Sequence, residues 1–147
     1  MTASEQTQNS STFAGWRATT AVALGLFSVA PHLFLPRAAS LDLAAVLLGI
    51  IAGVYFGFAV ARGSLRDQLT ELCVATGFGV AAVLGLILSP WSLPGAYFAH
   101  SLWDFAHHNR AALRLVAIPQ WYVPWCATID ALIGVGLVTV WRSTGVL

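Results

Sequence analysis

The sequence predicts an all-α integral membrane protein, a bundle of five transmembrane helices. Of its 147 residues, 58% are hydrophobic and only 9% are charged, whereas about a quarter of the residues of a soluble domain are charged. Apolar runs of about 20 residues, the length that crosses a bilayer, recur between short polar loops. These features exclude a soluble enzyme, and the net charge of +1 argues against a nucleic-acid-binding protein.

The polar N-terminal segment, residues 1–13, is predicted to be a disordered cytoplasmic tail, because it lacks the apolar residues that a packed structure needs. It carries Glu5 and no basic residue, which is not the pattern that opens a cleaved signal peptide. Residues 14–147 are predicted to form a single transmembrane helical domain.

The first two helices are predicted over residues 16–35 and 41–61. Pro31 interrupts the end of the first helix, because proline lacks the backbone N–H that a helix interior needs. Ser40 is a predicted N-cap of the second helix, and Asp42 is predicted in its first turn, where an acidic side chain favours the helix dipole.

The third helix is predicted over residues 65–88, and it begins with a candidate capping box between Ser64 and Asp67. Ser92 is a candidate cap of the fourth helix, which is expected to reach at least His108. The fifth helix is predicted over 124–141, after an aromatic segment at 120–125 of the kind found at membrane interfaces.

The distribution of arginines predicts the orientation. With five spans, five arginines fall on one side and Arg37 and Arg142 fall on the other, so the larger group is predicted to be cytoplasmic. The protein is therefore expected in the plasma (inner) membrane as a multi-pass protein with a cytoplasmic N-terminus. Four spans with a re-entrant fourth segment is the alternative. The five arginines are Arg17, Arg62, Arg66, Arg110 and Arg114.

The predicted fourth helix carries a dense group of ionisable side chains. They share an arc of about 100° on one helix face, and such groups are costly at membrane depth unless they are paired, hydrated or bound to metal. Imidazole and carboxylate at helical spacings suit zinc or non-heme iron. The predicted metal ligands are His100, Asp104, His107 and His108.

Other helices are expected to complete this site. Asp130 on the fifth helix and Glu71 on the third are each predicted to lie about 9 Å from the inner membrane edge, near the depth of His107. They are the candidate catalytic residues, as further ligands or as a general base. His32 is shallower, and its membership of the site is left open.

Two motifs, HSLWDFAHH and WYVPWCATID, resemble a pattern in small bacterial integral membrane proteins that pair an HxxWDxxHH helix with a WYxPxCxxxD helix. The resemblance implies shared residues and no particular reaction. More loosely, the His107–His108 pair is similar to the histidine boxes of membrane metalloenzymes such as desaturases, which use more histidines than the four of this chain. The matching positions are His100, Trp103, Asp104, His107, His108, Trp121, Tyr122, Pro124, Cys126 and Asp130.

The favoured function is a membrane-embedded metal-dependent enzyme, a hydrolase or an oxidoreductase, that acts on a lipid-like small molecule with zinc or iron as cofactor. The first alternative is a proton or metal-ion relay or transport protein, because a column of His and Asp side chains through a bundle also fits that role. The second is a small heme-anchoring or accessory subunit, for which His32 and His100 are the cross-helix pair at similar depth.

The second helix also carries a tandem GxxxG pattern at Gly49, Gly53 and Gly57, which lets helix backbones approach closely. It predicts either a homo-oligomer or packing within the chain against the third helix, where Gly77, Gly79 and Gly85 offer a partner face.

Overall fold

The computed structural model describes the backbone of residues 3–109, 113 and 115–147, and side chains from residue 15 onward outside the same gaps. This part of the chain is all helical and contains no strand. The elements are α1 (Ala3–Val29), the short 3₁₀ helix η1 (Ala30–Leu33), α2 (Arg37–Arg62), α3 (Leu65–Ile87), α4 (Ser92–His108) and α6 (Tyr122–Thr144).

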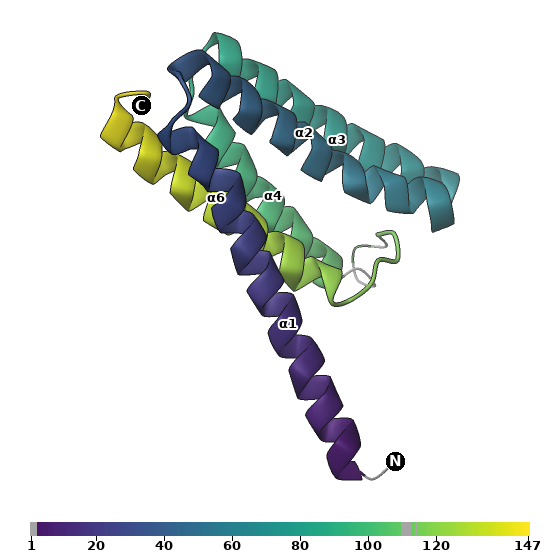
Figure 1. The fold of residues 1–147 in the computed structure, drawn as a ribbon. Helices are drawn as coiled ribbons and strands as arrows, with labels where there is room; N and C mark the ends of the chain where they lie inside the picture. Colours follow the sequence, from purple (N-terminus) through teal and green to yellow (C-terminus); the bar gives the residue numbers. More distant parts are fainter. Residues whose placement is uncertain (1–2, 110–112, 114) are drawn as a thin grey trace.

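The helices are arranged as two pairs with a fifth helix laid across them. α2 and α3 lie side by side, and α4 packs along α6 (Figure 1). α1 crosses α6 on its outer side, and contacts between α3 and α4 join the two pairs. Because consecutive helices run in opposite directions, residues far apart in the sequence meet between the pairs.

Three helices, α2, α3 and α6, are long and apolar enough to cross a membrane, so the chain has the character of a membrane protein. The prediction of five spans is not confirmed. α4 has 17 residues and carries ionisable side chains, and at 1.5 Å per residue its length is about 26 Å, less than the roughly 30 Å of a hydrocarbon core. The count of five, and the re-entrant alternative for the fourth segment, stay predictions.

The helix boundaries confirm one predicted cap and correct two. The capping box is present at the start of α3, where Ser64 and Asp67 bond each other's backbone N–H. The cap predicted at Ser40 is wrong, because α2 begins directly after Pro36 and the Ser40 N–H already bonds the Pro36 carbonyl. Asp42 therefore lies beyond the first turn. Ser92 is the first residue of α4 rather than its cap, and its hydroxyl donates to the Ser89 carbonyl.

The first helix also differs from its predicted bounds. Its α-helical part ends at Val29, and Pro31 lies at the start of η1, where a missing N–H costs nothing. The helix begins at Ala3, so the backbone is helical in most of the segment 1–13 for which disorder is predicted. The cytoplasmic location of that segment stays a prediction.

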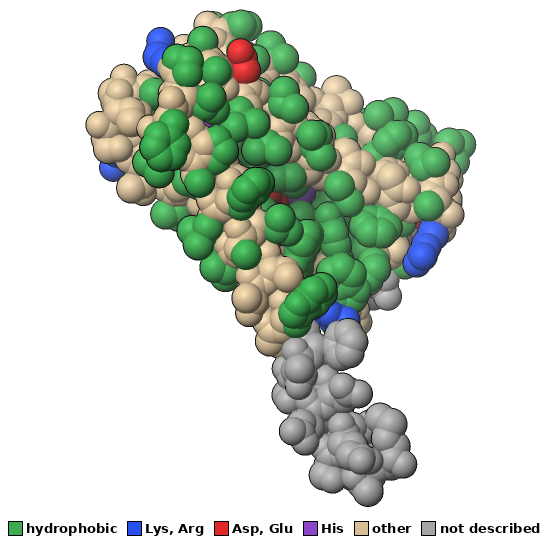
Figure 2. Space-filling view, in the orientation of Figure 1, with side chains coloured by type: hydrophobic (Ala, Val, Ile, Leu, Met, Phe, Trp, Pro, Cys, Tyr) green, Lys and Arg blue, Asp and Glu red, His purple; other side chains and the backbone are tan. Residues whose placement is uncertain are grey.

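The main core lies where α2, α4 and α6 meet. Tyr97 and Trp141 are fully buried there, and the Tyr97 hydroxyl donates to the Ala44 carbonyl at 2.8 Å. At the other end of α6, Val116 and Ile118 of the connecting loop pack beside α2 in a second cluster. Large apolar side chains cover much of the outer surface (Figure 2), as expected of helices that face lipid.

The glycines of α2 do not pack against α3. A Cβ added at Gly49, Gly53 or Gly57 would meet nothing within 4 Å, so internal packing is the wrong explanation for this pattern. The homo-oligomer stays a prediction. By contrast, a Cβ at Gly85 of α3 would lie 2.4 Å from the Leu93 side chain of α4.

This difference predicts opposite effects of two equivalent substitutions. Gly85→Ala should destabilise the protein by about 1–3 kcal/mol, because it overpacks the contact with the fully buried Leu93. Gly53→Ala should leave thermal stability in detergent unchanged or raise it, since its Cβ has open space. Equal melting temperatures for the two variants would contradict the packing described here.

Candidate functional site

One face of α4 is turned into the protein and carries the ionisable side chains. His100, Asp104 and His107 are each at most 2% exposed, so this face is buried as predicted. His108 lies on the outer side and is exposed. The short helix is held in place on one side by α6 and on the other by α3.

His100 and Asp104 meet two residues of α6. The His100 Nδ1–H donates to Asp130 Oδ2 at 2.7 Å, and Asp104 Oδ1 lies 3.8 Å from the same nitrogen. The Cys126 thiol, one helical turn before Asp130, contacts Asp130 Oδ2 at 3.8 Å. These four residues, called here the α4–α6 cluster, each offer one ligand atom, and the four atoms lie within 4.8 Å of one another. The prediction that Asp130 faces His100 and Asp104 is confirmed.

Tyr55 of α2 closes the cluster from a third side. Its hydroxyl donates to Asp104 Oδ1, and its ring contacts the His100 ring with centroids 5.6 Å apart. Phe78 of α3 contacts the His100 ring with a centroid distance of 4.9 Å. The imidazole is therefore oriented by two aromatic neighbours and one carboxylate.

Two carboxylate oxygens of the cluster, Asp104 Oδ2 and Asp130 Oδ1, are buried and have no hydrogen-bond partner. A buried polar atom left unpaired costs about 1–3 kcal/mol, and more if it is charged. A cation between the two carboxylates would satisfy both oxygens. The cluster is thus a buried group that could bind a metal ion, and its Asp, His and Cys donors are of the types that zinc accepts.

His107 forms a separate pair with Glu71 of α3. The His107 Nε2–H donates to Glu71 Oε1 at 2.9 Å, and the Trp103 indole N–H donates to Glu71 Oε2 at 3.3 Å. Nδ1 of His107 faces the Trp103 carbonyl at 3.2 Å. Both ring nitrogens therefore face hydrogen-bond acceptors, which fixes the orientation of the ring between α3 and the backbone of α4.

The structure therefore divides the predicted site residues into two groups. His100, Asp104 and Asp130 come together, whereas His107 and Glu71 bond each other and lie outside the group of four ligand atoms. The Tyr55 ring links the two groups, since it also contacts the His107 ring with centroids 4.4 Å apart. His108 joins neither group.

His32 lies in η1 and bonds outside both groups through Nδ1, whereas its buried Nε2 has no hydrogen-bond partner. Its Nδ1 shares a hydrogen bond of 2.7 Å with the Ser40 hydroxyl, which also accepts from the Trp141 indole N–H at 2.8 Å. Trp141 lies eleven residues beyond Asp130 on α6, about 16 Å along the helix axis. This polar contact ties η1 to α2 and α6 and is distant from the α4–α6 cluster.

Sequence reasoning missed Tyr55 and the role of Cys126. Tyr55 stands in an apolar run, and no spacing in the sequence relates it to Asp104, 49 positions away. Cys126 lies one helical turn before Asp130, which places both side chains on one face of α6. That spacing is the signal that could have identified it.

No protein-family model, curated protein or solved structure matches this chain.

Proposed function

We propose that the protein is a membrane-embedded metal-dependent enzyme whose metal is held in the α4–α6 cluster by His100, Asp104 and Cys126, with Asp130 beside it. The observation that carries this proposal is that the four residues of the α4–α6 cluster bring one ligand-type atom each within 4.8 Å of the others, and that two carboxylate oxygens of the same residues have no hydrogen-bond partner. Isolated charges are unfavourable in an apolar interior. Buried ionisable side chains are therefore expected to be paired, bound to metal or required for function.

The donor set favours zinc over iron. A thiolate, an imidazole and a carboxylate are all zinc ligands, and three such donors would leave the fourth tetrahedral position open for water. A divalent cation would also offset the negative charge of the two aspartates, both of which are fully buried. Iron is the alternative metal, since imidazole and carboxylate donors also bind it.

The residues around the metal would have different roles in the reaction. A bound zinc ion would supply Lewis acidity and activate water at neutral pH. Tyr55 holds Asp104 through its hydroxyl, and Asp130 is the candidate general base, because its Oδ1 has no other partner. Glu71 is engaged by His107 and Trp103, so it is proposed as a positioning residue for α4 rather than as a base.

A lipid-like substrate fits the location of this site. Most of the molecular surface around it is apolar, and Figure 2 shows small patches of acid and histidine atoms deep among hydrophobic side chains near the middle of that face. A substrate that reaches these atoms from the bilayer would have to be apolar itself.

Equilibrium metal binding tests the proposal. The protein, purified in detergent and stripped with a chelator, should take up about one equivalent of Zn²⁺, and binding should raise its melting temperature because only the folded state offers the site. His32→Ala should bind zinc like the wild type, since His32 bonds Ser40 instead. Absence of saturable binding of both Zn²⁺ and anaerobically added Fe²⁺ would overturn the proposal.

One observation favours a proton relay as the second candidate. Titratable side chains extend from Glu71 through His107 and, across the Tyr55 ring, to Asp104, His100 and Asp130. Proton flux into liposomes that is abolished by Glu71→Gln, in a protein that binds no metal, would favour this function. A heme anchor would show a Soret band in the same preparation.

We also propose five spans with a cytoplasmic N-terminus, supported by the uneven distribution of arginines along the sequence and by the alternating direction of successive helices in the described residues (Figure 1). Because the number of spans is odd, the C-terminus should lie outside. Reporter fusions at Leu147 should be active in the periplasm, and a cytoplasmic C-terminus would favour four spans with a re-entrant segment.

A further inference from the structure

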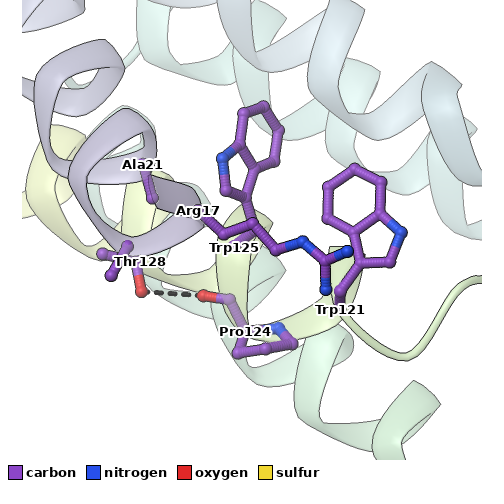
Figure 3. A pocket seen from close by; sticks show the side chains of 7 residues that line it. Arg17, Ala21, Trp121, Pro124, Trp125 and Thr128 are labelled. Atoms are coloured by element: carbon purple, nitrogen blue, oxygen red, sulfur yellow. Dashed lines mark hydrogen bonds between the residues drawn. The ribbon is translucent and has the colours of Figure 1, made fainter. Parts of the chain in front are cut away.

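Two adjoining cavities on the outer side of α6 are used by neither group of buried ionisable residues. The first, of about 300 Å³, lies between α1 and the beginning of α6, with Arg17 and Trp121 at its polar end (Figure 3). The second, of about 400 Å³, lies between α4 and α6. Pro124 and Thr128 line both, so the two cavities are neighbours along α6.

The polar end of the first cavity suits an anion. The Arg17 guanidinium lies over the Trp121 ring, 5.1 Å from its centroid, which orients the cation at the cavity (Figure 3). The Trp125 indole N–H donates to the Thr20 hydroxyl at 3.1 Å and fastens α1 to α6. A guanidinium presents a planar array of donors that matches the oxygens of a phosphate group.

The second cavity is almost entirely apolar and follows α6 into the membrane. Its lining extends along α6 from Pro124 to Val135, a length of about 16 Å. Half of a bilayer's hydrocarbon core is about 15 Å thick. Ala127 and Ala131 leave room along this path because their side chains are small. The second cavity is therefore long enough and apolar enough to hold one acyl chain within one leaflet, and it is called here the acyl-chain cavity.

We propose that these two cavities bind an anionic phospholipid, with its phosphate at Arg17 and Trp121 and one acyl chain along α6. A free phosphate ion would leave the apolar cavity unused. The predicted cytoplasmic position of Arg17 agrees with this assignment, because anionic lipids of that leaflet attract basic residues.

The cavity between α4 and α6 and the α4–α6 cluster are formed by neighbouring residues of the same two helices. The Ser101 hydroxyl donates to the Ala127 carbonyl at 3.1 Å, and both residues line the acyl-chain cavity. Ser101 directly follows His100, and Ala127 directly follows Cys126. The inference that the bound lipid is the substrate rests on the proposed function. The inference that the lipid binds at these cavities does not.

Native mass spectrometry of the detergent-purified protein tests the site, with phosphatidylglycerol and phosphatidylcholine of identical acyl chains as probes. Wild type should bind phosphatidylglycerol about fivefold more tightly than phosphatidylcholine, and Arg17→Ala should remove this preference. Arg142→Ala is the matched control, because Arg142 stacks on Trp91 at the same 5.1 Å but at the other end of α6. Equal loss in both variants, or retention in Arg17→Ala, would overturn the proposal.

A second pair of variants tests the acyl-chain cavity. Ala131→Trp should fill the cavity and weaken binding of both lipids, whereas Leu102→Trp, on an exposed position of α4, should not. Displacement of phosphatidylglycerol by inorganic phosphate alone, with no effect of Ala131→Trp, would overturn the lipid assignment. The zinc content of Arg17→Ala separates the two proposals. Loss of lipid binding with zinc binding retained would support independent sites. Absence of zinc from wild type and every variant would contradict only the proposed function.

Discussion

Replacing His100 by alanine is expected to lower zinc affinity at least about a hundredfold. Removal of residues that merely orient a metal ligand costs 10–100-fold, and His100 supplies the only imidazole among the four converging ligand atoms of the described chain. Asp130→Asn should have a similar effect, because it removes the charge of the carboxylate that His100 and Cys126 both contact. Competition against a zinc chelator gives the affinities.

His107→Ala is the matched control for His100→Ala, since both histidines lie on the buried face of α4. The sequence pattern predicts that His107 is a ligand, but its Nε2 is bonded to Glu71. We therefore expect His107→Ala to retain zinc affinity within a few fold of the wild type. A hundredfold loss in His107→Ala together with an unchanged His100→Ala would show that the metal lies at the other group.

Glu71→Ala is expected to destabilise the protein by about 1–3 kcal/mol without loss of the metal site. Removing one partner of a buried hydrogen-bonded pair costs this much, because the other polar group is left buried and unsatisfied. Glu71 and His107 are each at most 2% exposed, and Glu71 also accepts from Trp103. Melting in detergent, followed by intrinsic fluorescence, measures the effect, and zinc affinity is measured below the melting transition.

Two comparisons make the Glu71 result specific. Glu71→Gln should lose less stability than Glu71→Ala, because its amide oxygen still accepts a hydrogen bond in the same place. Asp67→Ala removes an acid from the same helix, but at the exposed capping box, where a smaller loss of stability is expected. If Glu71→Ala melted at the temperature of Asp67→Ala, the buried pair would not be a major contributor to stability.

Local patterns in the sequence were sufficient for much of the fold. The capping box at Ser64 and Asp67 and the apolar run after it located α3 to within a residue at its end. The start of α2 is less clear from the sequence, because Pro36 is its N-cap and the helix begins at Arg37, four residues before the predicted start at 41. The serine that was expected to cap that helix instead bonds a histidine and a tryptophan from other elements, which no local pattern shows.

The candidate site could be predicted only in part, because local patterns do not show contacts between helices. Helical periodicity is sufficient to place His100, Asp104 and His107 on one face. It does not determine which neighbouring helix each side chain meets. His107 lies toward α3 and bonds Glu71, whereas His100 lies toward α6 and bonds Asp130. That division depends on how α4 fits between the helix pairs, and depth estimates along single helices cannot resolve it.

The central claim, that the α4–α6 cluster holds a metal, is tested most directly by cobalt substitution. Co²⁺ bound to a cysteine thiolate gives an intense ligand-to-metal charge-transfer band in the near ultraviolet, so the spectrum reports whether Cys126 is a ligand. We predict this band in Co²⁺-loaded wild type and in Cys73→Ser, whose cysteine is the exposed one on α3, and its disappearance in Cys126→Ser. A band that persists in Cys126→Ser, or no bound Co²⁺ in the wild type, would contradict the assignment.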